Sequence, residues 1–180
     1  YGLPGTKKLM KNMEKCFRDN PEAKTFLMAK HGTVILGDDF EEAFALAEAL
    51  EDGCRDRFKK RVPDHDVFRY SDFDTESVAT EEFPVVVLQR DYYGMECCMA
   101  GLKLKSYVDD FAQIVGPDAA CVDNNPAKVK AALKNRNAVL VRGVGAVCTG
   151  ADRSDAEAVA MIVSKNCAAA CYARTARLPA

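Results

Sequence analysis

The sequence predicts an α/β protein that uses one strand–turn–strand–helix unit twice. Two short apolar runs, 25–29 and 33–36, flank a turn and precede a long amphipathic helix. Sliding the sequence by 113 positions lays a second such stretch, which begins near Val139, over the first. Short apolar runs bounded by turn residues are typical of strands, and a helical hydrophobic period follows each pair. These observations predict α/β architecture with an internal repeat.

The identities between the two stretches fall on positions that control local structure. They comprise turn glycines, a helix cap and one helix face, namely Gly32 and Gly145, Gly37 and Gly150, Asp39 and Asp152, Ala43 and Ala156, and Cys54 and Cys167. The turn itself differs, because the first stretch has His31 where the second has Val144. The scaffold is therefore expected to be shared, with a reactive side chain in the first copy.

Helix boundaries follow from capping residues. A first helix is expected from the Thr6 N-cap to Asp19, since Pro21 disfavours the helical conformation of the residue before it. Asp39 and Glu42 have the spacing of a capping box at the start of the next helix. Its predicted buried face is Ala43, Leu46, Ala47, Leu50, Cys54 and Phe58. The face predicted for the second copy is Ala156, Val159, Ala160, Val163, Cys167 and Cys171.

The remaining sequence suggests three parts, 1–60, 61–83 and 84–180. The segment 61–83 has no sustained hydrophobic period and many acidic residues, which is typical of a connecting segment. The module after it begins with a strand over 84–89 and includes a helix over 126–134 before the second repeat. The stretch 90–105 has no clear pattern.

The composition excludes several classes of protein. A hydrophobic content of 48% with 29% charged residues is typical of a folded globular chain. The net charge of −2, with both signs interspersed, provides no basic stripe for nucleic acid or for a membrane surface. No apolar run approaches the roughly 18–20 residues that span a bilayer, and the chain does not start with a secretory leader pattern. We therefore expect neither nucleic acid nor membrane partners.

The eight cysteines predict reduced thiols. The sequence has no C-x-x-C motif and no zinc-finger spacing. Five of them fall on apolar helix faces or in an apolar strand, where a thiol packs as a small hydrophobic group: Cys16, Cys54, Cys148, Cys167 and Cys171. Reduced thiols favour a cytoplasmic location.

The sequence AKHGTVILGDDFEEAFALAEALE, at 29–51, resembles the C-terminal part of the class II aldolase/adducin domain. YGLPGTKKL, at 1–9, is similar to the Pro-Gly-Thr segment that opens the preceding helix in that family. The second copy, within 84–180, resembles the extra module that follows the domain in longer members. The resemblance implies a three-layer αβα fold with a mainly antiparallel sheet.

The resemblance also implies a divalent metal, usually zinc, held by three histidines. In the family this metal stabilises an enediolate during retro-aldol cleavage of a sugar or sugar phosphate, and His31 matches the third ligand. The other two come from a His-x-His pair that precedes the matching segment. This chain has two histidines, His31 and His65, and no His-x-His pair. His31 is therefore either a ligand completed by residues outside this chain or an inherited turn histidine that bonds a neighbouring carbonyl.

Two functions follow from this resemblance. The chain is either the C-terminal part of a metal-dependent class II aldolase-like protein or a non-catalytic, adducin-like module for binding or oligomerisation. In the first case the 180 residues alone should be inactive, because one imidazole is a poor zinc site. The family also implies a homo-oligomer, or a complementary N-terminal chain that supplies the missing ligands.

Other candidate residues have simpler structural explanations. His65 is expected on the surface, and the turn 142–145 is expected to be a hairpin rather than an anion site. Asp109 and Asp110 are more typical of helix capping or solvent exposure than of acid–base catalysis. The acidic residues Asp72, Asp74, Glu76, Glu81 and Glu82 are expected to be solvated, and Cys97-Cys98 lacks the basic surroundings of a reactive thiol.

Overall fold

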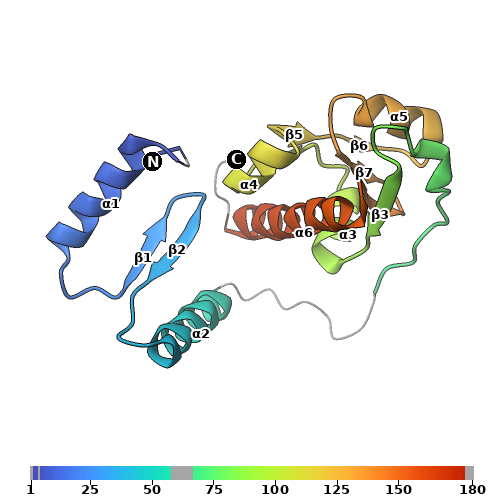
Figure 1. Ribbon diagram of the computed structural model, residues 1–180. Coiled ribbons are helices and arrows are strands. Elements are labelled where there is room, and N and C mark those ends of the chain that lie inside the picture. The colour runs from blue at the N-terminus through green and yellow to red at the C-terminus, as the bar shows by residue number, and fades with distance from the viewer. Residues whose placement is uncertain (1, 4, 58–66, 177–180) are drawn as a thin grey trace. The chain divides into compact units, whose positions relative to one another are not determined.

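A computed structural model of the chain describes residues 2, 3, 5–57 and 67–176. The chain divides into two compact units, residues 1–59 and 60–180, and each is described by itself (Figure 1). Both contain helices and strands, so the predicted α/β class is confirmed. None of the helices in the described ranges is long and apolar enough to cross a membrane.

Unit 1 is a hairpin flanked by two helices. Its elements are α1 (Lys7–Asp19), β1 (Thr25–Met28), β2 (Gly32–Ile35) and α2 (Phe40–Arg57). Thr6 caps α1 as predicted, because its hydroxyl accepts the Leu9 N–H at 3.3 Å. β1 and β2 are antiparallel, with Phe26 opposite Val34. Phe26 packs edge-on against Phe17 of α1, with ring centroids 4.6 Å apart.

Unit 2 is larger and contains the main sheet. Its elements are η1 (Glu76–Val78), β3 (Val85–Gln89), α3 (Tyr92–Met99), β4 (Leu104–Lys105), α4 (Asp109–Ile114), β5 (Asp118–Ala119), β6 (Cys121–Val122), α5 (Pro126–Leu133), β7 (Ala138–Val141), β8 (Gly145–Gly150) and α6 (Arg153–Thr175). The strand predicted over 84–89 and the helix predicted over 126–134 are both present, each one residue shorter.

The main sheet is mixed, so the prediction of a mainly antiparallel sheet is not confirmed. Its strand order is β3-β8-β7-β6. β8 is antiparallel to both β3 and β7, whereas β6 runs parallel to β7. The parallel pair arises because α5 connects β6 to β7 and returns the chain in the same direction.

Helices cover both faces of the main sheet. Alternate residues of β7 point into two different clusters: Leu140 packs with residues of α3, α4 and α6, whereas Val139 packs with Val78 and Val129. All of these side chains are buried. The sheet of unit 2 therefore lies between two helical layers, as Figure 1 shows for α6 and α5.

Residues 70–83, which belong to the predicted connecting segment 61–83, pack on unit 2. The Ser71 N–H donates to the Gly143 carbonyl at 2.7 Å, and Val78 is 2% exposed. The acidic side chains at 72, 74, 76, 81 and 82 are exposed, as expected for solvated groups. Residues 61–66 lie outside the described residues.

The two predicted helix faces have different outcomes. The face predicted for α6 is buried at all six positions, and that prediction is confirmed. The prediction that α2 has a buried face is wrong. All residues of α2 are described, and none of them is buried. Phe58 lies outside the described residues. Spacing identifies an apolar face, but burial also requires a partner to cover it.

Candidate functional site

His31 lies in the tight turn between β1 and β2. Its backbone N–H donates to the Met28 carbonyl at 3.0 Å, and its side chain is partly buried. The residues on either side have positive φ, +65° at Lys30 and +133° at Gly32. Such values suit glycine, so Lys30 is held in a conformation that side chains rarely adopt. The turn thus places one imidazole at the end of the hairpin.

The turn of the second hairpin has the same backbone geometry. Gly143 and Gly145 have φ values of +75° and +121°, and the Val144 N–H donates to the Val141 carbonyl at 3.0 Å. The side chain of Val144 is completely buried. At the position of His31, unit 2 therefore has an apolar side chain inside its core.

The strand ends also correspond across the 113-position shift. The Leu36 N–H donates to the Lys24 carbonyl at 2.7 Å, and the Thr149 N–H donates to the Asn137 carbonyl at 2.8 Å. The register agrees as well, since Phe26 pairs with Val34 as Val139 pairs with Val147. The two hairpins therefore share their strand pairing and their turn.

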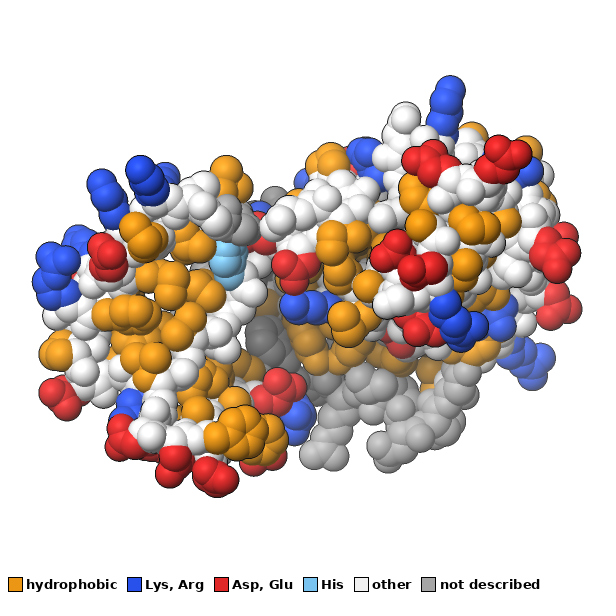
Figure 2. Space-filling model, in the orientation of Figure 1, with side chains coloured by type: hydrophobic (Ala, Val, Ile, Leu, Met, Phe, Trp, Pro, Cys, Tyr) orange, Lys and Arg blue, Asp and Glu red, His pale blue; other side chains and the backbone are white. Residues whose placement is uncertain are grey.

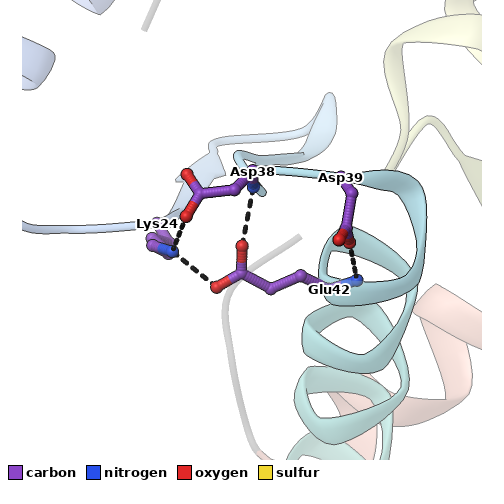
Figure 3. Close-up of polar contacts among 4 residues, drawn as sticks. All are labelled: Lys24, Asp38, Asp39 and Glu42. Carbon is purple, nitrogen blue, oxygen red and sulfur yellow. Dashed lines mark hydrogen bonds and ion pairs between the residues drawn. The ribbon is translucent and has the colours of Figure 1, made fainter.

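A polar cluster fixes the start of α2 next to the strand ends (Figure 3). The Asp39 carboxylate accepts the Glu42 N–H at 2.8 Å, while Glu42 reaches back to the Asp38 N–H at 2.6 Å. Lys24 donates to Glu42 at 2.5 Å and lies 3.7 Å from the Asp38 carboxylate. The predicted capping box is present, with Asp38 as the residue that Glu42 reaches.

The cluster shifts the proton affinity of two of its members. The hydrogen bond from the Asp38 N–H, together with Lys24, lowers the pKa of the Glu42 carboxyl. The hydrogen bond to Glu42 raises the pKa of the Lys24 amine. Both groups are exposed, so the cluster is a helix cap in water rather than a buried catalytic pair. Lys24, the residue just before β1, was not among the residues predicted from the sequence.

Arg90 connects three segments of unit 2 beside the second turn. Its Nε donates to the Val144 carbonyl at 3.1 Å, and its Nη2 donates to the Ser71 carbonyl at 3.0 Å. The guanidinium carbon lies 5.2 Å from the centre of the Tyr70 ring, within the range of a cation–π contact. Arg90 falls in the stretch 90–105, for which the sequence predicted no structure.

The described residues alone do not provide the ligand set that the family resemblance implies. Among them, no group of three or more His, Cys, Asp or Glu side chains is arranged to hold a metal ion. His65 lies outside the described residues. A divalent cation at His31 would therefore need ligands that these residues do not contribute.

The other candidate residues of unit 2 have structural roles. The turn 142–145 is a hairpin whose carbonyls accept hydrogen bonds from Ser71 and Arg90. Asp109 and Asp110 are the first two residues of α4, whose N-cap is Val108. Asp109 is buried rather than solvated, and Asp110 lies 3.4 Å from the Lys165 amine. These contacts favour the structural explanations over anion binding and acid–base catalysis.

Of the five cysteines predicted to pack as small hydrophobic groups, some are buried and others are exposed. Cys148, Cys167 and Cys171 are buried, whereas Cys16 and Cys54 are exposed. All eight cysteines lie in described segments, and none forms a disulfide.

The Cys97-Cys98 pair is buried in unit 2. A hydrogen bond with Cys167 and burial raise the pKa of the Cys97 thiol to about 12, and burial raises the pKa of Cys98 to about 12. The thiolate, which is the reactive form, is therefore disfavoured at both positions.

A search of curated proteins found no match to this sequence. A comparison with protein-family models matched the first part of the chain. Members of the matched family generally use a divalent metal ion. Residues 1–57 match the class II aldolase and adducin N-terminal domain, and the family resemblance predicted for this part of the chain is confirmed.

Proposed function

We propose that this chain is part of a metal-dependent class II aldolase-like protein that cleaves a sugar or sugar phosphate by a retro-aldol reaction. The observation that carries the proposal is the position of His31. This histidine lies in a hairpin turn within the segment that matches the family, and the resemblance described above makes it the counterpart of the third metal ligand. A divalent cation there would supply Lewis-acid chemistry.

His31 would contribute one imidazole to the metal, and the other two ligands would come from outside this chain. Unit 2 indicates where such ligands could approach the turn. There β3 pairs with β8, and Arg90, the residue after β3, reaches the backbone of Val144. A strand paired with β2 in the same way would end beside His31. Two side chains at alternate positions of that strand would share one face, as a His-x-His pair requires.

The two hairpins are, in this proposal, copies of one scaffold with different tasks. Their common register and turn hydrogen bonds support a duplication. The first copy keeps an imidazole, whereas the second has Val144 buried in its core. Unit 2 would therefore be a second aldolase-like module without the metal ligand. The proposal includes a homo-oligomer, as the family resemblance implies, and a cytoplasmic location, which the eight free cysteines favour.

The alternative function is a non-catalytic module for binding or oligomerisation, as in adducin. Exposed hydrophobic side chains of unit 1, Leu27 and Phe40 among them, favour it because they suit a protein interface. The two functions differ in their need for a metal.

Metal analysis of the complete polypeptide tests the proposal. The expected result is about one divalent cation per chain, lost in His31→Ala. His65→Ala is the matched control, because it removes the other histidine and should leave the metal content unchanged. If His31→Ala retains its metal, the assignment is wrong. A metal-free wild-type protein that self-associates in analytical ultracentrifugation would favour the binding module.

A further inference from the structure

Six of the eight cysteines gather in one hydrophobic cluster of unit 2, on the sheet face that α3, α4 and α6 cover. Five are buried, and the sixth packs against them from β6: Cys97, Cys98, Cys148, Cys167, Cys171 and Cys121. A buried thiol usually packs as a small hydrophobic group, so the number of cysteines alone indicates no chemistry. Disulfide chemistry requires two sulfur atoms in contact and a route by which an oxidant reaches one of them.

Cys97 of α3 and Cys171 of α6 meet the first requirement. Their Sγ atoms lie 3.8 Å apart, although the two residues are 74 positions apart in the sequence. A disulfide holds its sulfur atoms about 2.05 Å apart. Each sulfur would therefore move by about 0.9 Å toward the other to form the bond, a displacement that rotation about the Cα–Cβ bonds can supply.

Small side chains let α3 and α6 pack closely against each other. Gly94 lies one turn before Cys97 in α3, and Ala170 lies next to Cys171 in α6; both are buried. The side chains at a helix contact set the distance between the helix axes, and a disulfide needs Cα atoms within about 6.8 Å of each other. The contact between these two helices is therefore suited to a cross-link.

Cys171 also lines a pocket at the C-terminal ends of α3 and α6. The pocket has a volume of about 430 Å³, and Arg174 and Glu96 place a cation and a carboxylate in its lining. Cys171 is 2% exposed, whereas Cys97 is completely buried. Hydrogen peroxide is little larger than water and fits a pocket of this size. Of the two thiols, Cys171 is thus the one that an oxidant reaches first.

The two thiols would take different parts in an oxidation. The pKa of Cys97 is raised to about 12, so its thiol stays protonated and is a poor first target for an oxidant. Its contact with the Cys171 sulfur instead suits it to the second step, in which one sulfur attacks another that is already oxidised.

We propose that Cys97 and Cys171 are an oxidation site, at which hydrogen peroxide converts the two thiols into a reversible disulfide between α3 and α6. The Cys171 sulfur attacks a peroxide oxygen, the O–O bond breaks, and hydroxide leaves with the thiol proton as water, which gives a sulfenic acid. The Cys97 sulfur then attacks the sulfenic sulfur, the S–O bond breaks, and hydroxide leaves with the Cys97 proton as water. Two thiols are oxidised while one peroxide is reduced to two waters. Both cysteines lie in unit 2, so the site does not depend on a metal at His31.

Peptide mass spectrometry of the 180-residue chain tests the bond. Cys16→Ser and Cys54→Ser first remove the two exposed thiols of unit 1, where Figure 2 shows hydrophobic side chains gathered at the surface and where oxidation would link two molecules. After peroxide treatment and digestion without reductant, we expect cross-linked peptides that contain Cys97 and Cys171 and that dithiothreitol separates. If the other six thiols stay reduced, or become sulfinic acids without a cross-link, the proposal is overturned.

Neighbouring cysteines provide matched controls, because Cys98 adjoins Cys97, and Cys167 lies one turn before Cys171 in the same buried cluster. Cys97→Ala and Cys171→Ala should each abolish the cross-link, whereas Cys98→Ala and Cys167→Ala should retain it. A cross-link that survives Cys171→Ala, or one that joins Cys98 to Cys121, contradicts the assignment.

The melting temperature provides a second measurement on the same proteins. A cross-link between residues 74 positions apart restricts the unfolded chain, so the oxidised protein should melt at least about 4 °C above the reduced one. Dithiothreitol should reverse this shift. An equal shift in Cys171→Ala would contradict the assignment.

Discussion

At the scale of single residues, the two hairpin turns differ at the imidazole and at the residue before it. Unit 2 has glycine at Gly143 and a buried valine at Val144, whereas unit 1 has Lys30 and His31. Lysine at φ +65° is disfavoured by contact between its Cβ and the backbone. We therefore expect the turn of unit 1 to be less stable than the corresponding turn of unit 2.

Lys30→Gly should stabilise the hairpin. Relief of the left-handed conformation gains about 1–2 kcal/mol, and the greater backbone freedom of glycine in the unfolded chain removes about 0.5–1 kcal/mol of it. The net gain should be of the order of 0.5–1 kcal/mol in urea unfolding followed by circular dichroism. Gly32→Ala, the control at φ +133°, should destabilise instead. A destabilised Lys30→Gly variant would show that the lysine side chain has a role of its own.

At the scale of elements, the cap of α2 depends on long-range polar contacts. Lys24 precedes β1, and its amine reaches Glu42 in the first turn of α2. The capping box was predictable because its residues are close in sequence. The contribution of Lys24 was not predictable, because a sequence pattern does not show which strand end lies next to the start of a helix.

The cap should weaken at both acid and alkaline pH. Since the pKa of Glu42 is lowered, its contribution is complete above the ordinary carboxyl pKa and is lost as the pH falls through the lowered value. Since the pKa of Lys24 is raised, its contribution is complete below the ordinary lysine pKa and is lost as the pH rises through the raised value.

In the Glu42→Gln variant, the stability of the cap should therefore no longer decrease as the pH falls. Amide protection in the first turn of α2 measures this stability. Glu41→Gln is the matched control, because it removes a carboxylate from the same helical turn but leaves the contacts to Lys24 and Asp38 intact. Equal effects of the two substitutions would attribute the dependence to the helix dipole alone.

Element boundaries were largely predictable from sequence, but burial was not. Apolar runs and caps predicted both hairpins and the start of α2. The same spacing predicted buried faces for α2 and α6, and only α6 has a sheet and helices against it. α3 was missed because its inward residues include Gly94, Cys97 and Cys98, which make a weak hydrophobic pattern. His31 could be proposed only through the family resemblance, since spacing alone gave it no partner.

At the scale of the whole molecule, the stability of the chain should reside mainly in unit 2. Its two clusters bury both faces of the sheet. Unit 1 buries little beyond Phe26 and Gly2 within the described residues. Apolar area removed from water is the main source of stability, so the two units should differ strongly in their sensitivity to mutation.

Leu140→Ala and Leu27→Ala test this difference at matched register positions. Leu140→Ala should cost about 2–5 kcal/mol of unfolding free energy, because it leaves a cavity in a buried cluster. Leu27→Ala should change the stability of the 180-residue chain by less than about 0.5 kcal/mol, because the side chain is already in water. Urea unfolding of each variant measures both values, and comparable losses would mean that unit 1 has a core of its own.

Arg90 has a further consequence for the second turn. A guanidinium is cationic throughout the physiological pH range, and here it is covalently part of the chain that it holds together. Neither dilution nor a chelator such as EDTA can remove that charge from the turn of unit 2. The first turn, if it holds a cation, depends on metal supply. One polypeptide would thus have a permanent cation at one copy of its turn and an exchangeable one at the other.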